Sequence, residues 1–133
     1  MSLPRGIHAA TSNAPVNFVA RDDVAAAAAG ILVGDGHHGA IYHATGPAAL
    51  DGVARASLVS KVTGKSFAFA PVSVAQYREG LAAAGLPPFI VDAVLSIQDM
   101  WSVGGFDVTT GDVERLAGRP PRSLEDALRH AKL

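Results

Sequence analysis

Apolar positions along the chain form short alternating runs that are separated by longer runs at helical spacing. Val16–Val19 alternates and is rich in β-prone residues, which predicts a strand. The alanine-dominated run Val24–Leu32 predicts a helix, because alanine has the highest helix propensity. A second strand is predicted over Ala40–Thr45, and a second helix over Ala48–Val62, where leucine and valine recur at helical spacing.

The second half of the chain continues this alternation. Phe67–Val72 predicts a third strand. Ser73 followed by Gln76 has the spacing of a capping box, which predicts a helix that begins there and runs through Ala84. A further helix is predicted over Phe89–Val103, directly after two prolines that suit a first helical turn. Shorter elements are predicted at Phe106–Thr110 (extended), at Asp112–Leu116 (helical) and from Ser123 onward (helical).

This order of elements indicates an α/β fold. Strands that alternate with helices tend to pair in parallel, so we expect a small, partly parallel sheet with flanking helices. A small sheet leaves two edges, and an exposed edge invites pairing with another chain. The 133 residues suffice for one domain, and residues 1–15 show no sustained period, so we expect an irregular amino-terminal segment.

Composition excludes several classes of function. Eleven basic and twelve acidic residues give a net charge of -1, so the chain has no basic surface for nucleic acid and no basic run for a membrane. Cysteine is absent, which excludes disulfides, thiolate metal sites and cysteine nucleophiles. No apolar run has the length of a membrane span, and the first residues lack the pattern of a signal peptide. We therefore expect a cytoplasmic protein.

A search for catalytic motifs is mostly negative. The sequence has no Gly-rich dinucleotide-binding turn, no P-loop and no Gly-x-Ser-x-Gly elbow. Neither Tyr42 nor Tyr77 is followed by a lysine four residues later. The pair His37-His38 lacks the further ligands that a metal site needs, and it is typical of a polar loop tip.

Charged residues in two places have both a structural and a functional interpretation. Asp22 and Asp23 precede the alanine-rich helix, where a carboxylate acts as an N-cap more often than as an acid or base. Arg119 and Arg122 flank two prolines; they could hold an anion, although a solvated turn is the more common reading of such a segment.

Two sets of residues are candidates for a substrate pocket. His43 and Thr45 lie at the end of a predicted strand, where open α/β sheets place ligands. The large side chains of the second half could line an apolar cleft, although an alanine-rich chain also needs them as core anchors. The predicted pocket comprises His43, Tyr77, Phe89, Met100, Trp101 and Phe106.

Six segments in a fixed order carry a family resemblance. They are "VNFVARDDVAAAAAGIL" (16–32), "IYHATGP" (41–47), "VTGK" (62–65), "FAPVSVAQY" (69–77), "GGFDVTT" (104–110) and "GRPPRSL" (118–124). Together they resemble the carboxyl-terminal part of NmrA-like, atypical short-chain dehydrogenase/reductases, in particular the NAD(P)H:quinone oxidoreductase-like branch. The resemblance covers nearly all of the chain from Pro15 onward.

The resemblance implies a Rossmann-type fold whose amino-terminal half binds NADP or NAD. That half has no counterpart here, so no cofactor-binding or catalytic residue is transferred, and we expect this chain alone to bind no cofactor. Asp23 would cap the helix that follows the first strand, and Gly46 and Pro47 would end the next strand. Met100, Trp101 and Phe106 would lie in the part of the family that covers the substrate.

Three functions remain open at this point. The first is the substrate-side part of an NAD(P)H-dependent reductase of quinone-like acceptors, inactive alone because the cofactor half is missing. The second is a non-catalytic NmrA-like binding or regulatory module, and the third is a relative of sugar-nucleotide epimerases. The expected partner is a second copy of the chain or the missing cofactor-binding half. Two origins fit the missing half: a piece of a longer reductase, or the product of a truncated gene.

Overall fold

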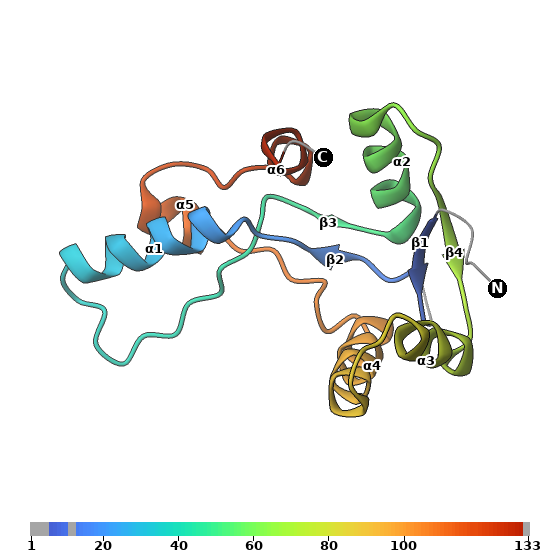
Figure 1. Ribbon diagram of the computed structural model, residues 1–133. Helices are drawn as coiled ribbons and strands as arrows, with labels where there is room; N and C mark the ends of the chain where they lie inside the picture. Colours follow the sequence, from blue (N-terminus) through green and yellow to red (C-terminus); the bar gives the residue numbers. More distant parts are fainter. Residues whose placement is uncertain (1–5, 11–12, 132–133) are drawn as a thin grey trace. The chain divides into compact units, whose positions relative to one another are not determined.

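The computed structural model describes residues 6–10 and 13–131 (Figure 1). It divides into two compact units, each built from separate stretches of the chain. Unit 1 comprises Met1–Val16 and Leu50–Asp107, and unit 2 comprises Asn17–Ala49 and Val108–Leu133.

Unit 1 contains a parallel strand pair with three helices. β1 (Gly6–Ala9) pairs in parallel with β4 (Ala68–Pro71), with His8 opposite Ala70. A parallel pair needs a crossover connection, and α2 lies between the two strands in the sequence and contacts both. The helices of this unit are α2 (Gly52–Thr63), α3 (Val74–Ala83) and α4 (Pro88–Ser102). The predicted class, a small, partly parallel sheet with flanking helices, is confirmed.

Unit 2 is mainly helical. Its elements are α1 (Arg21–Val33), α5 (Asp112–Ala117) and α6 (Leu124–His130). Two very short strands, β2 (Val16–Asn17) and β3 (Ala49–Leu50), pair with each other. No helix among the described residues is long and apolar enough to cross a membrane.

The strand predictions need correction in three places. β1 lies inside the segment that we expected to be irregular. The strand predicted over Ala40–Thr45 is absent; its backbone is bonded instead by side chains, with Asp112 accepting from the His43 amide at 2.9 Å. The extended segment Phe106–Thr110 also forms no strand. Pairing depends on a neighbouring strand, which the local sequence does not specify.

The predicted start of α2 is also wrong, for a local reason. The helix begins at Gly52 rather than at Ala48, because the Asp51 carboxylate accepts a hydrogen bond from the Ala54 amide at 2.7 Å and so acts as the N-cap. At the other end Gly64 takes a left-handed conformation (φ 69°), which ends the helix where the sequence predicted a stop.

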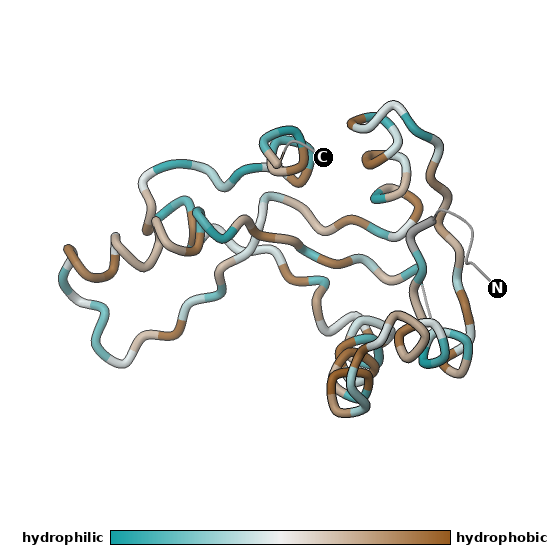
Figure 2. Tube along the Cα trace, in the orientation of Figure 1, coloured by the Kyte–Doolittle hydropathy of each residue, from teal (hydrophilic) through white to brown (hydrophobic). Residues whose placement is uncertain are grey.

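The core of unit 1 lies between α3, α4 and the residue that follows β1. Ala10, Val91 and Leu95 are buried together, and Tyr77 and Leu81 of α3 pack against them. The buried Gln98 side chain accepts a hydrogen bond from the Ala10 amide at 3.2 Å, so α4 also fixes the end of β1. In Figure 2, which colours each residue by hydropathy, most of α4 is brown, the colour of hydrophobic residues.

In unit 2 the core forms where α1 meets α5. Ala27 of α1 and Val113 of α5 are buried. The two helices approach so closely that a Cβ atom at Gly30 would overlap the carbonyl oxygen of Leu116. Glycine at position 30 is therefore a packing requirement, although glycine weakens a helix interior.

Replacing Ser73 with alanine tests the capping box of α3. The Ser73 hydroxyl accepts from the Gln76 amide at 3.1 Å, and the Gln76 side chain accepts from the Ser73 amide at 2.9 Å. We expect Ser73→Ala to lower the free energy of unfolding by about 1 kcal/mol, because the substitution leaves helix donors unpaired. Urea denaturation followed by circular dichroism measures the change, and an unchanged midpoint would contradict it.

Candidate functional site

One side of α4 exposes large apolar side chains. Phe89, Ile97, Met100 and Val103 recur at helical spacing and are all exposed, Phe89 by 70% and Met100 by 51%. The opposite side of the helix carries Val91, Leu95 and Gln98, which are buried. We call the exposed side the α4 outer face. A helix that is apolar on two sides has more apolar surface than unit 1 covers.

An aromatic pair lies at the carboxyl-terminal end of α4. The Gly104 and Gly105 amides donate to the carbonyl oxygens of Trp101 and Met100, at 3.0 and 2.9 Å, and this turn brings Phe106 back to the helix. The Trp101 and Phe106 rings meet edge to face, with their centroids 6.3 Å apart. The turn requires glycine at position 104, where φ is 76°.

A buried cation lies against the same indole. The Arg55 guanidinium of α2 lies 5.3 Å from the centroid of the Trp101 ring, a cation–π distance. Burial lowers the pKa of Arg55, and the neighbouring Asp51 charge opposes that shift. Arginine stays charged despite such a shift, so Arg55 places a positive charge beside the aromatic pair.

The predicted pocket residues fall into three environments. Phe89 and Met100 lie on the α4 outer face, and Trp101 and Phe106 form the pair at its end. Tyr77 packs against the core of unit 1. His43 belongs to unit 2, where its backbone rather than its ring makes the bonds described for it.

The segment around His43 is held by threonine and aspartate side chains. The Thr110 hydroxyl donates to the His43 carbonyl oxygen at 2.6 Å. The buried Thr45 hydroxyl accepts from the Thr110 amide at 2.9 Å and donates to the Thr110 carbonyl oxygen at 3.2 Å. Thr45 was a candidate ligand-binding residue, but its hydroxyl makes structural hydrogen bonds to the Thr110 backbone. At the next position the Asn17 side chain accepts from the Gly46 amide at 2.6 Å.

The histidine pair forms no metal site among the described residues, where no group of three histidine, aspartate or glutamate side chains could hold a metal ion. His37 Nδ1 and the Tyr42 hydroxyl are 2.7 Å apart and share a hydrogen bond. The Arg115 guanidinium lies 5.3 Å from the centroid of the Tyr42 ring. The loop is therefore fixed by a histidine–tyrosine contact.

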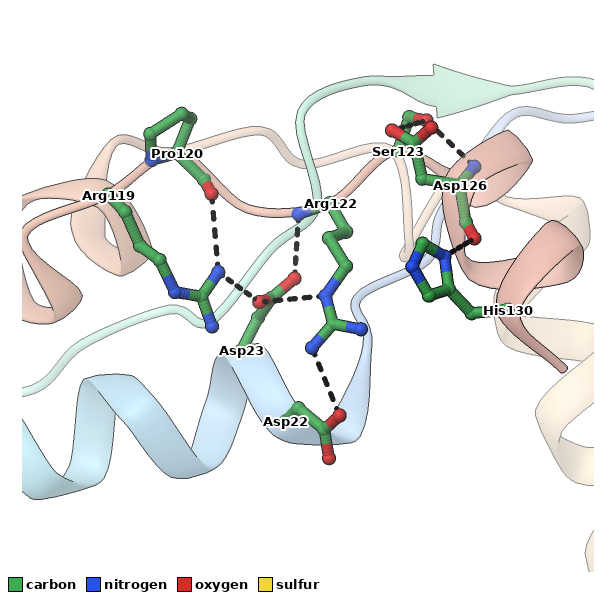
Figure 3. A network of polar contacts seen from close by, with 8 residues as sticks. All are labelled: Asp22, Asp23, Arg119, Pro120, Arg122, Ser123, Asp126 and His130. Carbon is green, nitrogen blue, oxygen red and sulfur yellow. Dashed lines mark hydrogen bonds and ion pairs between the residues drawn. The ribbon is translucent and has the colours of Figure 1, made fainter.

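Asp23 is not the N-cap of α1, which corrects the sequence prediction. Ala20 occupies the N-cap position and makes no side-chain cap, while Asp23 is the third residue of the helix. The Asp23 carboxylate is fully buried and accepts from Arg119 Nη1 at 2.6 Å and from the Arg122 amide at 2.7 Å (Figure 3). Arg119 and Arg122 do hold an anion, and that anion is the chain's own carboxylate.

This network was beyond sequence reasoning because 96 residues separate Asp23 from Arg119. The only sequence signal was charge: two aspartates at one helix start and two arginines around Pro120 and Pro121. A second ion pair joins Arg122 Nη2 to the exposed Asp22 carboxylate at 3.0 Å, so each of the two aspartates pairs with an arginine. The network fixes the segment between α5 and α6 to the start of α1.

Two carboxylates of unit 2 have lowered pKa values. Burial alone would raise the pKa of Asp23, but the Arg122 amide, the Arg119 hydrogen bond and both arginine charges together lower it below its ordinary value. The His43 amide and the Arg115 side chain lower the pKa of Asp112. Both groups therefore favour the folded state while they are ionised.

These shifts predict loss of stability in acid. A carboxyl whose pKa is lower in the folded state binds fewer protons there than in the unfolded state. Its contribution to the stability of the folded state is therefore complete above the unfolded pKa of about 4, and it is lost as the pH falls through the folded pKa. We expect a constant melting temperature above about pH 5 and a decline below about pH 4. Calorimetry across this range measures it. In the Asp23→Asn variant the decline should be smaller, and an equal decline would contradict the assignment to Asp23.

The starts of the four longest described helices, α1 to α4, do not fit a dinucleotide pyrophosphate, which needs free backbone donors and no nearby negative charge. α1 carries Asp22 and Asp23 in its first turn. The Asp51 side chain caps the start of α2, and the capping box of Ser73 and Gln76 pairs backbone donors at the start of α3. α4 begins with Pro87 and Pro88, which have no N–H groups. None of these four helix starts therefore offers free backbone donors away from negative charge.

Known proteins resemble this chain over most of its length. No protein-family model matches it. A (4-alkanoyl-5-oxo-2,5-dihydrofuran-3-yl)methyl phosphate reductase of Streptomyces griseus is 32% identical over 120 residues, which cover 90% of this chain and 42% of that protein. The NADPH complex of the Escherichia coli quinone oxidoreductase QOR2 is 26% identical with a TM-score of 0.88, and the match covers 96% of this chain and 45% of that one. A triphenylmethane reductase of Citrobacter sp. is 28% identical with a TM-score of 0.87, at the same two coverages.

In sequence and in fold, the chain is similar to the carboxyl-terminal part of NAD(P)H-dependent reductases. The resemblance seen in the sequence is thereby confirmed. The chain spans less than half the length of these reductases. The Citrobacter sp. triphenylmethane reductase has also been solved with NADP(H) bound, in agreement with the cofactor that we expect of the full-length reductases.

Proposed function

We propose that this chain forms the acceptor-binding side of an NAD(P)H-dependent reductase of quinone-like, aromatic acceptors. The observation that carries the proposal is the apolar surface of unit 1: Phe89 and Met100 on the α4 outer face, with Trp101 and Phe106 at its end. Aromatic rings and a thioether provide the polarizable surface on which a flat ring stacks. The similar proteins named for quinones and triphenylmethane dyes support this class of acceptor.

In this proposal the chain and the cofactor have separate roles. Reduction of a quinone to a hydroquinone takes one hydride and one proton, and the nicotinamide cofactor supplies the hydride. The α4 outer face offers an apolar surface for the acceptor, whereas the starts of α1 to α4 do not fit a pyrophosphate. In the proposal the chain binds and shields the acceptor, and it reduces nothing alone.

The test is a chimera in which the part of the Escherichia coli quinone oxidoreductase that precedes the matched region is joined to this chain. We expect the chimera to oxidise NADPH with 1,4-benzoquinone as acceptor. Met100→Ala and Phe89→Ala should raise the KM for benzoquinone about fivefold, equivalent to about 1 kcal/mol of lost apolar contact, with kcat nearly unchanged.

The matched control is Val74→Ala, which removes an exposed apolar side chain from α3 and should leave the KM unaltered. If the two α4 variants and the control have the same KM as the unsubstituted chimera, the α4 outer face does not bind the acceptor. An active chimera that rejects quinones but accepts another substrate would also reject the proposed acceptor class.

A further inference from the structure

α2 carries an arginine on its buried side. The buried residues of this helix are Gly52, Arg55 and Ala56, and only 7% of Arg55 is exposed. Arginine is rarely buried to this extent unless its charge is matched, and an apolar side chain at the same position would avoid the cost of removing that charge from water. The neighbours of Arg55 therefore show what its charge acts on.

The described neighbours of Arg55 are Asp51 and the indole of Trp101. Arg55 Nε donates to the Asp51 carbonyl oxygen at 3.3 Å, and its guanidinium carbon lies 5.3 Å from the centroid of the Trp101 ring. The two carboxylate oxygens of Asp51 accept bonds from the Ala54 amide and from the Asn13 side chain. Burial lowers the pKa of Arg55 by more than the Asp51 charge raises it, so this carboxylate does not make up for the water that the guanidinium has lost.

Two further carboxylates lie close to the aromatic pair in the sequence. Asp99 precedes Trp101 by two residues, and Asp107 directly follows Phe106; both aspartates are exposed. Water and salt screen an exposed charge much more than a buried one. We therefore expect the charge of Arg55, rather than these two, to dominate the field at the indole.

We propose that Arg55 makes the acceptor site selective for aromatic acceptors that carry a negative charge, such as a ring carboxylate or sulfonate. The flat ring stacks beside Trp101 and Phe106, and the guanidinium that lies against the indole attracts the anionic substituent. No direct contact is needed, because the energy of two charges in a poorly hydrated site falls only with the inverse of their distance. Arg55 is thus a specificity-determining residue. This inference rests on the proposed function and adds charge as the property that distinguishes acceptors.

The fluorescence of the isolated chain measures the charge of this site without any acceptor. Trp101 is the only tryptophan, so its emission reports one position. Iodide and caesium quench on collision and carry opposite charges. At constant ionic strength, and relative to a free tryptophan derivative, iodide should quench Trp101 more strongly than caesium does. The reverse order in the unsubstituted chain would overturn the proposal, and this measurement needs no variant.

Variants at position 55 assign the effect to the arginine. Arg55→Met keeps an unbranched side chain without the charge and should lower the iodide quenching constant about twofold, whereas Arg55→Lys should retain it. Acrylamide is neutral, so the ratio of iodide to acrylamide quenching separates charge from a change in packing. Arg78→Met is the matched control, because it makes the same change in net charge at an exposed arginine of α3 and should leave the ratio unaltered. An equal ratio in the Arg55→Met variant and the parent would reject the proposal.

The chimera described above tests selectivity with two probes, 1,4-naphthoquinone and its 2-sulfonate. Arg55→Met should raise the KM for the sulfonate about tenfold and change the KM for the neutral quinone little, and Arg55→Lys should restore the preference. Comparing the ratio of the two quinones across variants cancels their different reduction potentials. Equal changes for both quinones would show that Arg55 only supports the packing of Trp101. A chimera that reduces neither quinone would contradict the proposed function, while the quenching ratios would still decide the charge of the site.

Discussion

Replacing Asp23 with asparagine is expected to lower the free energy of unfolding by about 3 kcal/mol, a typical value for removing one partner of a buried ion pair. The carboxylate is fully buried and accepts from Arg119 and from the Arg122 amide. An asparagine of the same shape turns an N–H group toward one of these donors, so at least one bond is lost and the Arg119 charge is no longer balanced. The effect is at the lower end for buried pairs because Arg119 is itself partly exposed.

Urea denaturation followed by circular dichroism measures this change. The matched control is Asp22→Asn, since Asp22 carries the same carboxylate one residue earlier but is 76% exposed. Exposed ion pairs contribute at most about 1 kcal/mol, so we expect the control to change little. Equal effects of the two substitutions would show that the buried network does not hold the segment between α5 and α6 to α1.

Replacing Gly30 with alanine is expected to destabilise unit 2 by about 2 to 3 kcal/mol, although alanine is the better helix former. Two effects oppose each other. Helix propensity favours alanine by about 1 kcal/mol. The new Cβ would overlap the Leu116 carbonyl oxygen, so α5 must move away from α1, and the packing around the buried Ala27 and Val113 side chains is loosened. The clash involves backbone rather than a flexible side chain, so the packing loss prevails.

The measurement is the melting temperature, which should fall by about 10 °C for a unit of this size. Gly111→Ala is the control, because it makes the same chemical change where no atom lies within 4 Å of the new Cβ. We expect that variant to stay within about 0.5 kcal/mol of the parent. A more stable Gly30→Ala protein would mean that α1 and α5 are not in close contact.

The helices could be predicted where their signals are local. The capping box at Ser73 and the prolines before α4 placed the starts of α3 and α4 to within a residue or two. Glycine at position 64 likewise marked the end of α2. Each signal acts through hydrogen bonds or backbone angles within one turn, so neighbouring residues contain the necessary information.

The strands and the Asp23 network could not be predicted in the same way. A strand exists only where another strand pairs with it: β1 forms because β4 lies beside it, whereas the more β-prone Ala40–Thr45 forms none. Asp23 was given the role of a cap from its position before the alanines. Its buried carboxylate is instead matched by arginines almost a hundred residues away, which no local pattern reveals.

The residues of the candidate site could be predicted from the sequence, but which of them are exposed and which are in the core could not. Large side chains are few in this chain, so the sequence could single out Phe89, Met100, Trp101 and Phe106. It could not distinguish Tyr77, which packs in the core, from Met100, which is exposed, because both are large side chains on helices. That distinction depends on which side of each helix packs against the core of unit 1, and contacts between distant parts of the sequence decide this.

The most direct test is a titration of the isolated chain with NADPH, followed by the fluorescence of Trp101 and by calorimetry. We expect no saturable binding at micromolar cofactor, together with saturable binding by the chimera under the same conditions. One-to-one binding of NADPH by the isolated chain would contradict the assignment of all dinucleotide-holding groups to the part of the reductase outside these residues.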